Sequence, residues 1–323
     1  MNWSVQRSLV ARLVSTYLVL SLVVIVCVGG ASWLASRELL RDAAFARLET
    51  SSRQKETDLA LWVEERLRDM GLLGSLIASQ QGLKAAGQNH PLQPGPAMLS
   101  LFNDYKNSQP DVLEVLLLAP TGGRVLASTE ETSVDGYRAN YNFYIQGRQG
   151  PAVQSVYPSP DSLRSVLTVS MPVKDANGGL LGVLAMHLSL EPIAQIIRSR
   201  TGLGDTGETF LVDSSSLLVA SGRMDMESAQ RKTHSEGVAQ ALSGKNGRGL
   251  YVSDAGTQVL GVYRWMPAYQ MALLAEMSQA EAFAPAGRLA LTLVVVALVA
   301  AVILGIGVYI LSRRLARPVL AVT

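Results

Sequence analysis

The sequence predicts an α+β protein with a long N-terminal helix and two antiparallel-sheet modules, enclosed between two membrane-spanning helices. Three observations carry this prediction. Apolar segments without a charged residue lie near both ends of the 323-residue chain. A proline-free segment rich in helix-forming residues follows the first of them. After it, a strand–turn–strand pattern occurs twice, as expected for antiparallel strands joined by short turns.

The two apolar segments, residues 13–34 and 289–311, are long enough to cross a membrane. At ~1.5 Å per helical residue each reaches about 33 Å, and a hydrocarbon core is about 30 Å thick. The apolar stretch of a cleaved signal peptide is usually shorter, at ~7–15 residues. We therefore expect an uncleaved first span over residues 13–35 and a second span over residues 286–311.

The charges at the two ends predict the orientation. Residues 1–12 and 312–323 contain no acidic residue, and their basic residues are Arg7, Arg12, Arg313, Arg314 and Arg317. Because Lys and Arg are retained on the cytoplasmic side, we expect both ends in the cytoplasm and residues 36–285 outside it, at a cell inner (plasma) membrane. Removing these five from the 28 basic residues leaves 23 against 26 acidic ones, which gives no indication of nucleic-acid binding.

Residues 36–85 are expected to form a long helix followed by the start of a loop. Residues 36–80 contain no proline, and apolar residues recur at spacings of three and four. These residues are Leu59, Trp62, Val63, Leu67, Met70 and Leu73. Such a face packs either against its own domain or against a partner helix, and the two interpretations are compatible. We expect a homodimer. Residues 82–95, rich in Gly, Pro, Gln and Asn, are expected to be a loop.

Residues 86–200 are expected to form the first module. Residues 112–119 and 124–128 predict a hairpin around a Thr-Gly-Gly turn. Residues 165–173 alternate in the manner of a half-buried strand and return, after a turn, through residues 180–190. One face of this strand carries Leu167, Val169, Met171 and Val173, and the other carries Val166, Thr168 and Ser170.

The same plan repeats in residues 201–285, the expected second module. Residues 114–128 (EVLLLAPTGGRVLAS) and 208–221 (ETFLVDSSSLLVAS) share a strand, a turn of small residues and a strand ending in Ala-Ser. Three more strands are predicted over residues 249–253, 258–265 and 270–277, and a short helix over residues 191–200 links the modules. A duplication of this length indicates two modules of one fold. The only cysteine, Cys27, lies in the first span, so the exported region contains no intramolecular disulfide.

The order of span, helix, sheet, sheet and span resembles the double Cache family of extracytoplasmic sensors. The segment VSMPVKDANGGLLGVLAMHLSL resembles the end of that family's first module, and GDTGETFLVDSSSLLVAS resembles the opening of its second. The resemblance implies two stacked, PAS-like modules that bind a small molecule, with the ligand in the membrane-distal module. Residues 312–323 are similar to the beginning of a HAMP linker, which implies transmission of a signal to a cytoplasmic output.

An aromatic cluster between the two hairpins is the best candidate for ligand contact. Its members are Tyr137, Arg138, Tyr141, Phe143, Tyr144 and Tyr157. A guanidinium can hold a carboxylate while aromatic faces cover the rest of a ligand. The same residues would also serve a purely structural role, in which a loop is fixed by burying its own side chains. Thr168 and Ser170 on the sheet face are further candidates.

This cluster resembles the family's segment that closes over the ligand. Amino-acid sensors of the family usually have an arginine two positions before an aromatic pair, where this chain has Tyr141. Arg138 lies further upstream and would substitute, which favours another small carboxylate or polar metabolite over an α-amino acid. The resemblance also puts Asp175 where it could meet an amine, although a turn aspartate is the simpler interpretation.

No motif predicts catalysis, a metal or a cofactor in this segment. The three histidines, His90, His187 and His234, are far apart and have no second ligand type at metal-binding spacing. We expect His187 at the surface or at the edge of a pocket. The glycines of TGLGDTG fit a dinucleotide motif but follow a helix and precede a strand, the reverse of what that motif needs. Two alternatives to a receptor remain open: the sensory part of a membrane enzyme (a kinase, phosphatase or nucleotide cyclase) and a protein-binding membrane scaffold.

Overall fold

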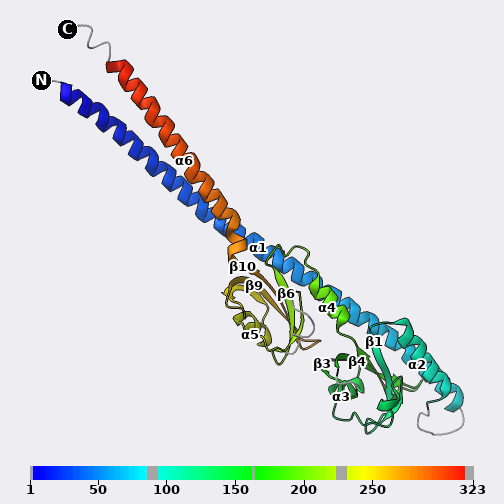
Figure 1. The fold of residues 1–323 in the computed structure, drawn as a ribbon. Helices are drawn as coiled ribbons and strands as arrows, with labels where there is room; N and C mark the ends of the chain where they lie inside the picture. Colours follow the sequence, from blue (N-terminus) through cyan, green and yellow to red (C-terminus); the bar gives the residue numbers. More distant parts are fainter. Residues whose placement is uncertain (1–2, 86–93, 162–163, 223–230, 317–323) are drawn as a thin grey trace. The chain divides into compact units, whose positions relative to one another are not determined.

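The computed structural model describes residues 3–85, 94–161, 164–222 and 231–316, and they form an α+β fold. Figure 1 shows two long helices, α1 (Trp3–Ala85) and α6 (Gln279–Ala316), and two sheets. The chain divides into one compact unit of residues 1–46 and 279–323 and another of residues 47–278.

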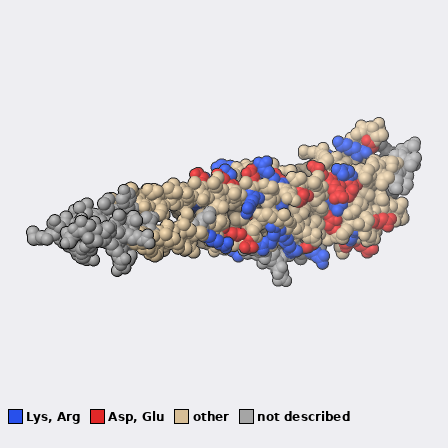
Figure 2. All heavy atoms as spheres, turned by 90° about the horizontal axis from the view of Figure 1, so that it is seen from above, with Lys and Arg blue, Asp and Glu red and all other residues tan. Residues whose placement is uncertain are grey.

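The first unit contains two helices that are long and apolar enough to cross a membrane. Their apolar windows are exposed, and the stretch beside the grey atoms at the left of Figure 2 carries no charged side chain in that view. The Arg37 guanidinium carbon lies 5.4 Å from the centre of the Trp33 ring and 4.9 Å from that of Phe283. Arg37 therefore joins α1 to α6 through cation–π contacts.

The first module is a five-stranded antiparallel sheet in the order β2-β1-β5-β4-β3. The strands are β1 (Val112–Leu118), β2 (Val125–Ser128), β3 (Ala152–Pro158), β4 (Ser165–Lys174) and β5 (Leu180–Leu188). The helices of the module are α2 (Pro96–Ser108), the 3-10 helix η1 (Glu131–Ser133) and α3 (Asn142–Gly147). Both predicted hairpins are present.

The second module repeats this order as β7-β6-β10-β9-β8. The strands are β6 (Glu208–Asp213), β7 (Leu218–Ser221), β8 (Gly247–Val252), β9 (Gln258–Met266) and β10 (Met271–Ser278). Helix α5 (Glu236–Leu242) belongs to this module, and α4 (Glu191–Arg198) precedes it in the chain. The identical strand order confirms the internal duplication.

The main core lies between α1 and one face of the sheets. The apolar stripe of α1 is buried there with residues of both modules, such as Met186 and Leu273. The stripe therefore packs against its own domain, which is one of the two interpretations given above. The outward side of α1 exposes other leucines, Leu61, Leu72 and Leu76.

Two local expectations need correction. The predicted loop does not begin at residue 82, because α1, which contains both the first apolar segment and the helix expected after it, continues to Ala85. Residues 86–93, which include His90, lie outside the described residues, as does Arg317. His187 is not at the surface, since only 1 % of it is exposed. Strand β3 was not predicted, because its sequence AVQSVYP has no clear alternation.

Candidate functional site

The face of the first sheet that points away from α1 carries both polar and apolar side chains. Period-two alternation places Thr168 and Ser170 of β4, and Glu114 and His187 of β1 and β5, on this face. All four are buried. Apolar residues of the same face form a small core with the aromatic cluster: Leu116, Leu118, Val125, Val183 and Ala185.

Helix α3 covers this face through a few specific contacts. Phe143 and Tyr144 are 0 % and 3 % exposed. The Ser170 hydroxyl donates to the Phe143 carbonyl at 2.6 Å, and Gln154 Oε1 accepts from the Phe143 N–H at 2.8 Å. The Gln154 bond satisfies one of the free N–H groups at the start of the helix, where Tyr141 offers no side-chain cap. The six residues of α3 are thus held by the sheet beneath them.

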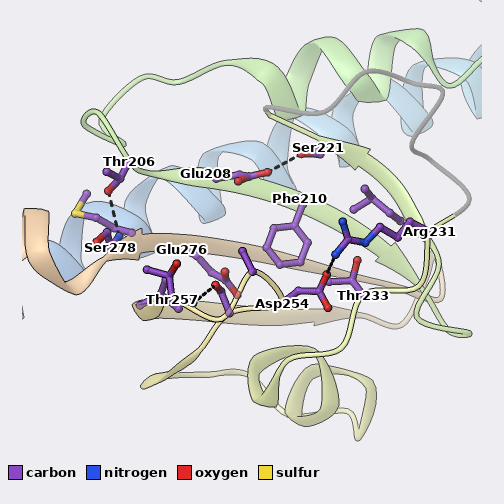
Figure 3. A pocket seen from close by; sticks show the side chains of 15 residues that line it. Thr206, Glu208, Phe210, Ser221, Arg231, Thr233, Asp254, Thr257, Glu276 and Ser278 are labelled. Atoms are coloured by element: carbon purple, nitrogen blue, oxygen red, sulfur yellow. Dashed lines mark hydrogen bonds and ion pairs between the residues drawn. The ribbon is translucent and has the colours of Figure 1, made fainter.

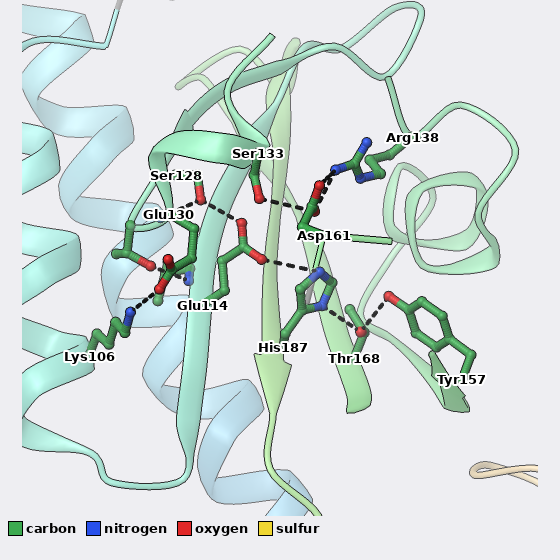
Figure 4. Close-up of polar contacts among 12 residues, drawn as sticks. Lys106, Glu114, Ser128, Glu130, Ser133, Arg138, Tyr157, Asp161, Thr168 and His187 are labelled. Atoms are coloured by element: carbon green, nitrogen blue, oxygen red, sulfur yellow. Dashed lines mark hydrogen bonds and ion pairs between the residues drawn. The ribbon is translucent and has the colours of Figure 1, made fainter. Parts of the chain in front are cut away.

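A chain of polar contacts crosses the face from β3 to β2 (Figure 4). The Tyr157 hydroxyl is 2.9 Å from Thr168 Oγ1, which is 2.7 Å from His187 Nδ1. His187 Nε2 lies 3.7 Å from Glu114 Oε2, and Glu114 Oε1 accepts from Ser128 Oγ at 2.5 Å. Because 3.7 Å exceeds hydrogen-bonding distance, Nε2 is buried without a hydrogen-bond partner.

Burial controls the protonation of these groups. It lowers the pKa of His187 to about 4, because the imidazolium would lose its hydration. It raises the pKa of Glu114 and that of Tyr157 for the corresponding reason, since burial disfavours the anion. At neutral pH His187 is therefore a neutral imidazole, able to donate one hydrogen bond and accept another.

An ion pair lies at the edge of the same face. Arg138 Nη2 donates to both carboxylate oxygens of Asp161, at 2.8 and 2.6 Å, and Ser133 Oγ donates to Asp161 Oδ2 at 3.0 Å. The two charged side chains are only 9 % and 18 % exposed. A cation and an anion thus stand side by side in a largely desolvated place next to the polar chain.

The structure brings together most of the predicted site residues. The rings of Tyr141, Phe143 and Tyr157 lie 5.6 to 6.3 Å apart, centre to centre, and Tyr144 donates to the Ala119 carbonyl at 3.1 Å. Tyr137, in contrast, is 68 % exposed.

Asp175 lies in the turn between β4 and β5. Its Oδ1 accepts from the N–H groups of Asn177 and Gly179 at 2.8 and 2.7 Å, as in an Asx turn. None of its recorded bonds reaches the aromatic cluster.

Sequence reasoning missed Glu114 and Asp161, and the surface position that it allowed for His187 is wrong. Asp161 precedes two residues outside the described ranges and follows a Pro-Ser-Pro segment, which reads as an ordinary loop. Glu114 is the one charged residue in the apolar run of β1, VLEVLLL, and this was a usable signal. Among the described residues, no group of three His, Cys, Asp or Glu side chains could hold a metal ion.

Comparisons with known proteins identify the fold. The sequence model of the Cache domain family matches residues 36–286. The ligand-binding domain of Mlp24 with asparagine has a TM-score of 0.54 and 16 % identity, over 77 % of this chain and 99 % of that one. The ligand-binding domain of the Pseudomonas fluorescens chemoreceptor CtaA with L-leucine has a TM-score of 0.52 and 15 % identity, over 77 % and 99 %.

A third similar structure is an extracellular domain described as that of a histidine kinase, mmHK1S-Z3. Its TM-score is 0.54 at 13 % identity, over 76 % of this chain and 98 % of that one. A comparison with curated protein sequences found no match. At these identities the structural likeness concerns the fold.

Proposed function

Because this chain belongs to the Cache domain family, we propose that it is the sensor part of a transmembrane receptor that binds a small molecule outside the cytoplasm. In this proposal α1 and α6 cross an inner membrane, and the first module is the membrane-distal one. The ligand lies under α3, among the aromatic cluster and the polar chain from Tyr157 to Glu114. The observation that best supports this ligand site is the Arg138–Asp161 ion pair on that face.

A buried ion pair contributes little net stability, because desolvation offsets most of the attraction. A ligand with a carboxylate would gain from Arg138, and one that also carries an ammonium group would gain from Asp161. Two similar domains are described with asparagine and with L-leucine, which carry both groups. This support extends the expected class of small carboxylates to amino acids, even though Tyr141 stands where the family's arginine is usual.

Transmission in this proposal uses the helices that enter and leave the membrane. Arg37 contacts Trp33 on α1 and Phe283 on α6, so a small shift of one helix changes its packing on the other. Shifts of about 1–2 Å at helix interfaces are an established way to carry a signal. Residues 312–323 would pass it to a HAMP-like linker in a homodimer. A kinase output is one form of this receptor, in line with the fold shared with mmHK1S-Z3.

A thermal-shift screen of the full chain in detergent tests the proposal. The probes are L-asparagine, L-leucine and a set of small mono- and dicarboxylates, because a ligand that binds only the folded state raises the melting temperature. With the best probe, Arg138→Ala is expected to cost about 2–4 kcal/mol of binding energy, a loss of roughly 30- to 1000-fold in affinity. Phe143→Ala and Tyr144→Ala should weaken binding and also lower the melting temperature.

The matched control is Arg124→Ala. Arg124 also pairs with an aspartate of the first module, Asp135, but the two side chains are 52 % and 68 % exposed. Its loss should leave affinity unchanged. If Arg138→Ala folds and binds as tightly as wild type, the ligand does not contact Arg138, and the sheet face around Thr168 and Ser170 without the ion pair is the next candidate. If none of the probes raises the melting temperature, the alternative of a protein-binding membrane scaffold is favoured.

A further inference from the structure

The second module contains a cavity of about 350 Å³, the size of a pocket for a small ligand. Strands β6 and β10, the 253–257 turn and the segment from Arg231 to Thr233 surround it (Figure 3). Its wall combines hydroxyl and carboxyl groups with the apolar side chains of Phe210, Leu218, Val259 and Met277. This cavity lies outside the site described above.

Two carboxyl groups stand next to each other in this cavity. Glu208 of β6 and Glu276 of β10 are register partners on adjacent antiparallel strands, so their side chains leave the same face as direct neighbours. Glu208 Oε1 accepts from Ser221 Oγ at 2.6 Å. Glu276 is only 8 % exposed, and its Oε1 is buried without a hydrogen-bond partner. The nearby Tyr251 hydroxyl does not reach it in hydrogen-bonding geometry.

The cation in the cavity wall is already engaged. Arg231 is the only Lys or Arg among the described lining residues, and its Nη2 pairs with Asp254 Oδ2. Asp254 Oδ1 also accepts from the His234 N–H. The two glutamates therefore face the cavity without a positive partner from the described chain. Burial, with the charges of Glu208 and Asp254, raises the pKa of Glu276 to about 7, while Tyr251 acts in the opposite direction.

The duplicated fold supplies an internal comparison. In the first module the register partners at the equivalent place are Glu114 and His187, an acid beside a base. Ser128 bonds to Glu114 there as Ser221 bonds to Glu208 here. The second module keeps the Ser–Glu pair and has Glu276 in place of the histidine. An acid–base pair has thus become a pair of acids, which complements a cation from outside.

We propose that the second module binds a small organic ammonium ion between Glu208 and Glu276, with the face of Phe210 against its carbon atoms. A carboxylate pair complements the positive charge, and an aromatic face adds cation–π attraction. The apolar wall favours an organic cation over a bare metal ion, which would prefer a cage of oxygen atoms. This site is independent of the ligand proposed for the first module.

Calorimetry on the full chain in detergent tests this site with ethanolamine, putrescine and choline as probes. At least one of them is expected to bind at pH 8, where Glu276 is mostly ionised. Ethylene glycol, which lacks the ammonium group, should not bind. Lowering the pH to 6 should weaken amine binding about tenfold, because Glu276 takes up a proton near pH 7 while the amines stay charged.

Substitutions then locate the amine. Glu276→Gln and Glu208→Gln should each lower affinity at least tenfold, and Glu276→Gln should remove most of the pH dependence. Glu191→Gln, at a solvent-exposed pair with Arg198 on α4, is the control and should change nothing. The melting temperature of each variant checks that it folds. Because the two glutamates are replaced in separate variants, a local misfold in one of them does not remove the test.

Several results would overturn the inference. They are no binding of any of the three amines, equal binding by the glutamine variants, and binding of calcium in their place. Asp161→Asn separates the two modules, since it should leave amine affinity intact. If this variant alone abolishes amine binding, the amine occupies the first module, so the second site is refuted and the proposed receptor function survives.

Discussion

Lys55 Nζ lies 2.6 Å from the carbonyl oxygen of Ile197, at the end of α4. The same ammonium group donates to the carbonyls of Ile196 at 3.0 Å and Ser199 at 2.5 Å. Its three N–H donors therefore meet the free carbonyls at the C-terminus of α4, where a positive charge is also favoured by the helix dipole. Lys55 is 4 % exposed, so α1 is fixed to the connection between the modules by a buried charge.

Replacement of this lysine should destabilise residues 47–278. Lys55→Met keeps the length and apolar stem but leaves the carbonyls of Ile196 and Ser199 without their donor, whereas the Ile197 carbonyl keeps a hydrogen bond from the Thr209 hydroxyl. Since each buried unsatisfied group costs about 1–3 kcal/mol, we expect a loss of about 2 kcal/mol or more in the free energy of unfolding, measured by denaturant melts of the full chain in detergent. Lys174→Met, at an exposed strand end, is the matched control. Equal melts for both variants would contradict this role.

The Lys55 contact shows where prediction from the sequence ends. Residues 165–173 predict which side chains share a face of β4 because alternation is a local property, and Leu167, Val169 and Val173 lie together in the main core. The expected half-burial is wrong, since Val166, Thr168 and Ser170 on the other face are buried as well. The bond between Lys55 and Ile197 spans 142 positions. No local pattern marks it, since a lysine on a long helix is usually solvated.

The candidate site follows the same division. The aromatic cluster could be found because Arg138, Tyr141 and Phe143 lie in one short segment. Asp161 could not be assigned to Arg138, because the strand β3 that returns the chain was not predicted. The pairing of Glu114 with His187 depends on the register of β1 against β5, and a shift of one residue would put these side chains on the other face.

The buried histidine predicts a specific response to acid. In the folded protein the pKa of His187 is about 4, below its ordinary value of 6.5, so the unfolded chain binds a proton first as the pH falls. Stability from this group is present above pH 6.5 and is lost as the pH falls to 4. Between pH 6.5 and pH 4 the wild type should therefore lose up to about 3 kcal/mol of unfolding free energy that His187→Gln does not lose. Denaturant melts of both proteins across this pH range measure the difference.

His234→Gln is the control for this pH series, since His234 is exposed. The raised pKa of Glu114 acts in the opposite direction at acid pH, which is why the comparison is made between variants at each pH. Parallel curves for wild type and His187→Gln would show that His187 titrates as an ordinary histidine.

The outward leucines of α1 predict the dimer contact. Leu61, Leu72 and Leu76 are 59, 62 and 47 % exposed, and the first two are about three helical turns apart on one face. After replacement of Cys27, single cysteines at these three positions should form disulfide-linked dimers in membranes. Asn177→Cys, in the exposed turn after β4, should not. Crosslinking that is the same at all four positions would count against an ordered helical interface.

The orientation of the chain predicts the outcome of reporter fusions. The basic residues precede the first apolar segment and follow the second, so both chain ends are expected in the cytoplasm. A fluorescent protein fused at Thr323 should therefore be active in the cytoplasm, and alkaline phosphatase fused at Gly150 should be active outside it. Alkaline phosphatase and a fluorescent protein, which work on opposite sides of the membrane, provide the two readouts. A cytoplasmic signal from Gly150 would refute the proposed topology.

The packing of α3 on the sheet can be tested without replacing any polar side chain. A Cβ atom added to Gly147 would lie 2.6 Å from Ser170 Oγ and 2.9 Å from Ser170 Cβ, both too close for real contacts. Gly147→Ala should therefore lift the end of α3 from the sheet and cost about 1–3 kcal/mol of stability, as overpacking does. Because the proposed ligand lies under α3, the affinity for the probe found in the thermal-shift screen should fall as well. Gly150→Ala is the control, since a Cβ at Gly150 meets no atom within 4 Å. If Gly147→Ala lowers the melting temperature but leaves affinity unchanged, α3 only closes the core and does not cover the ligand.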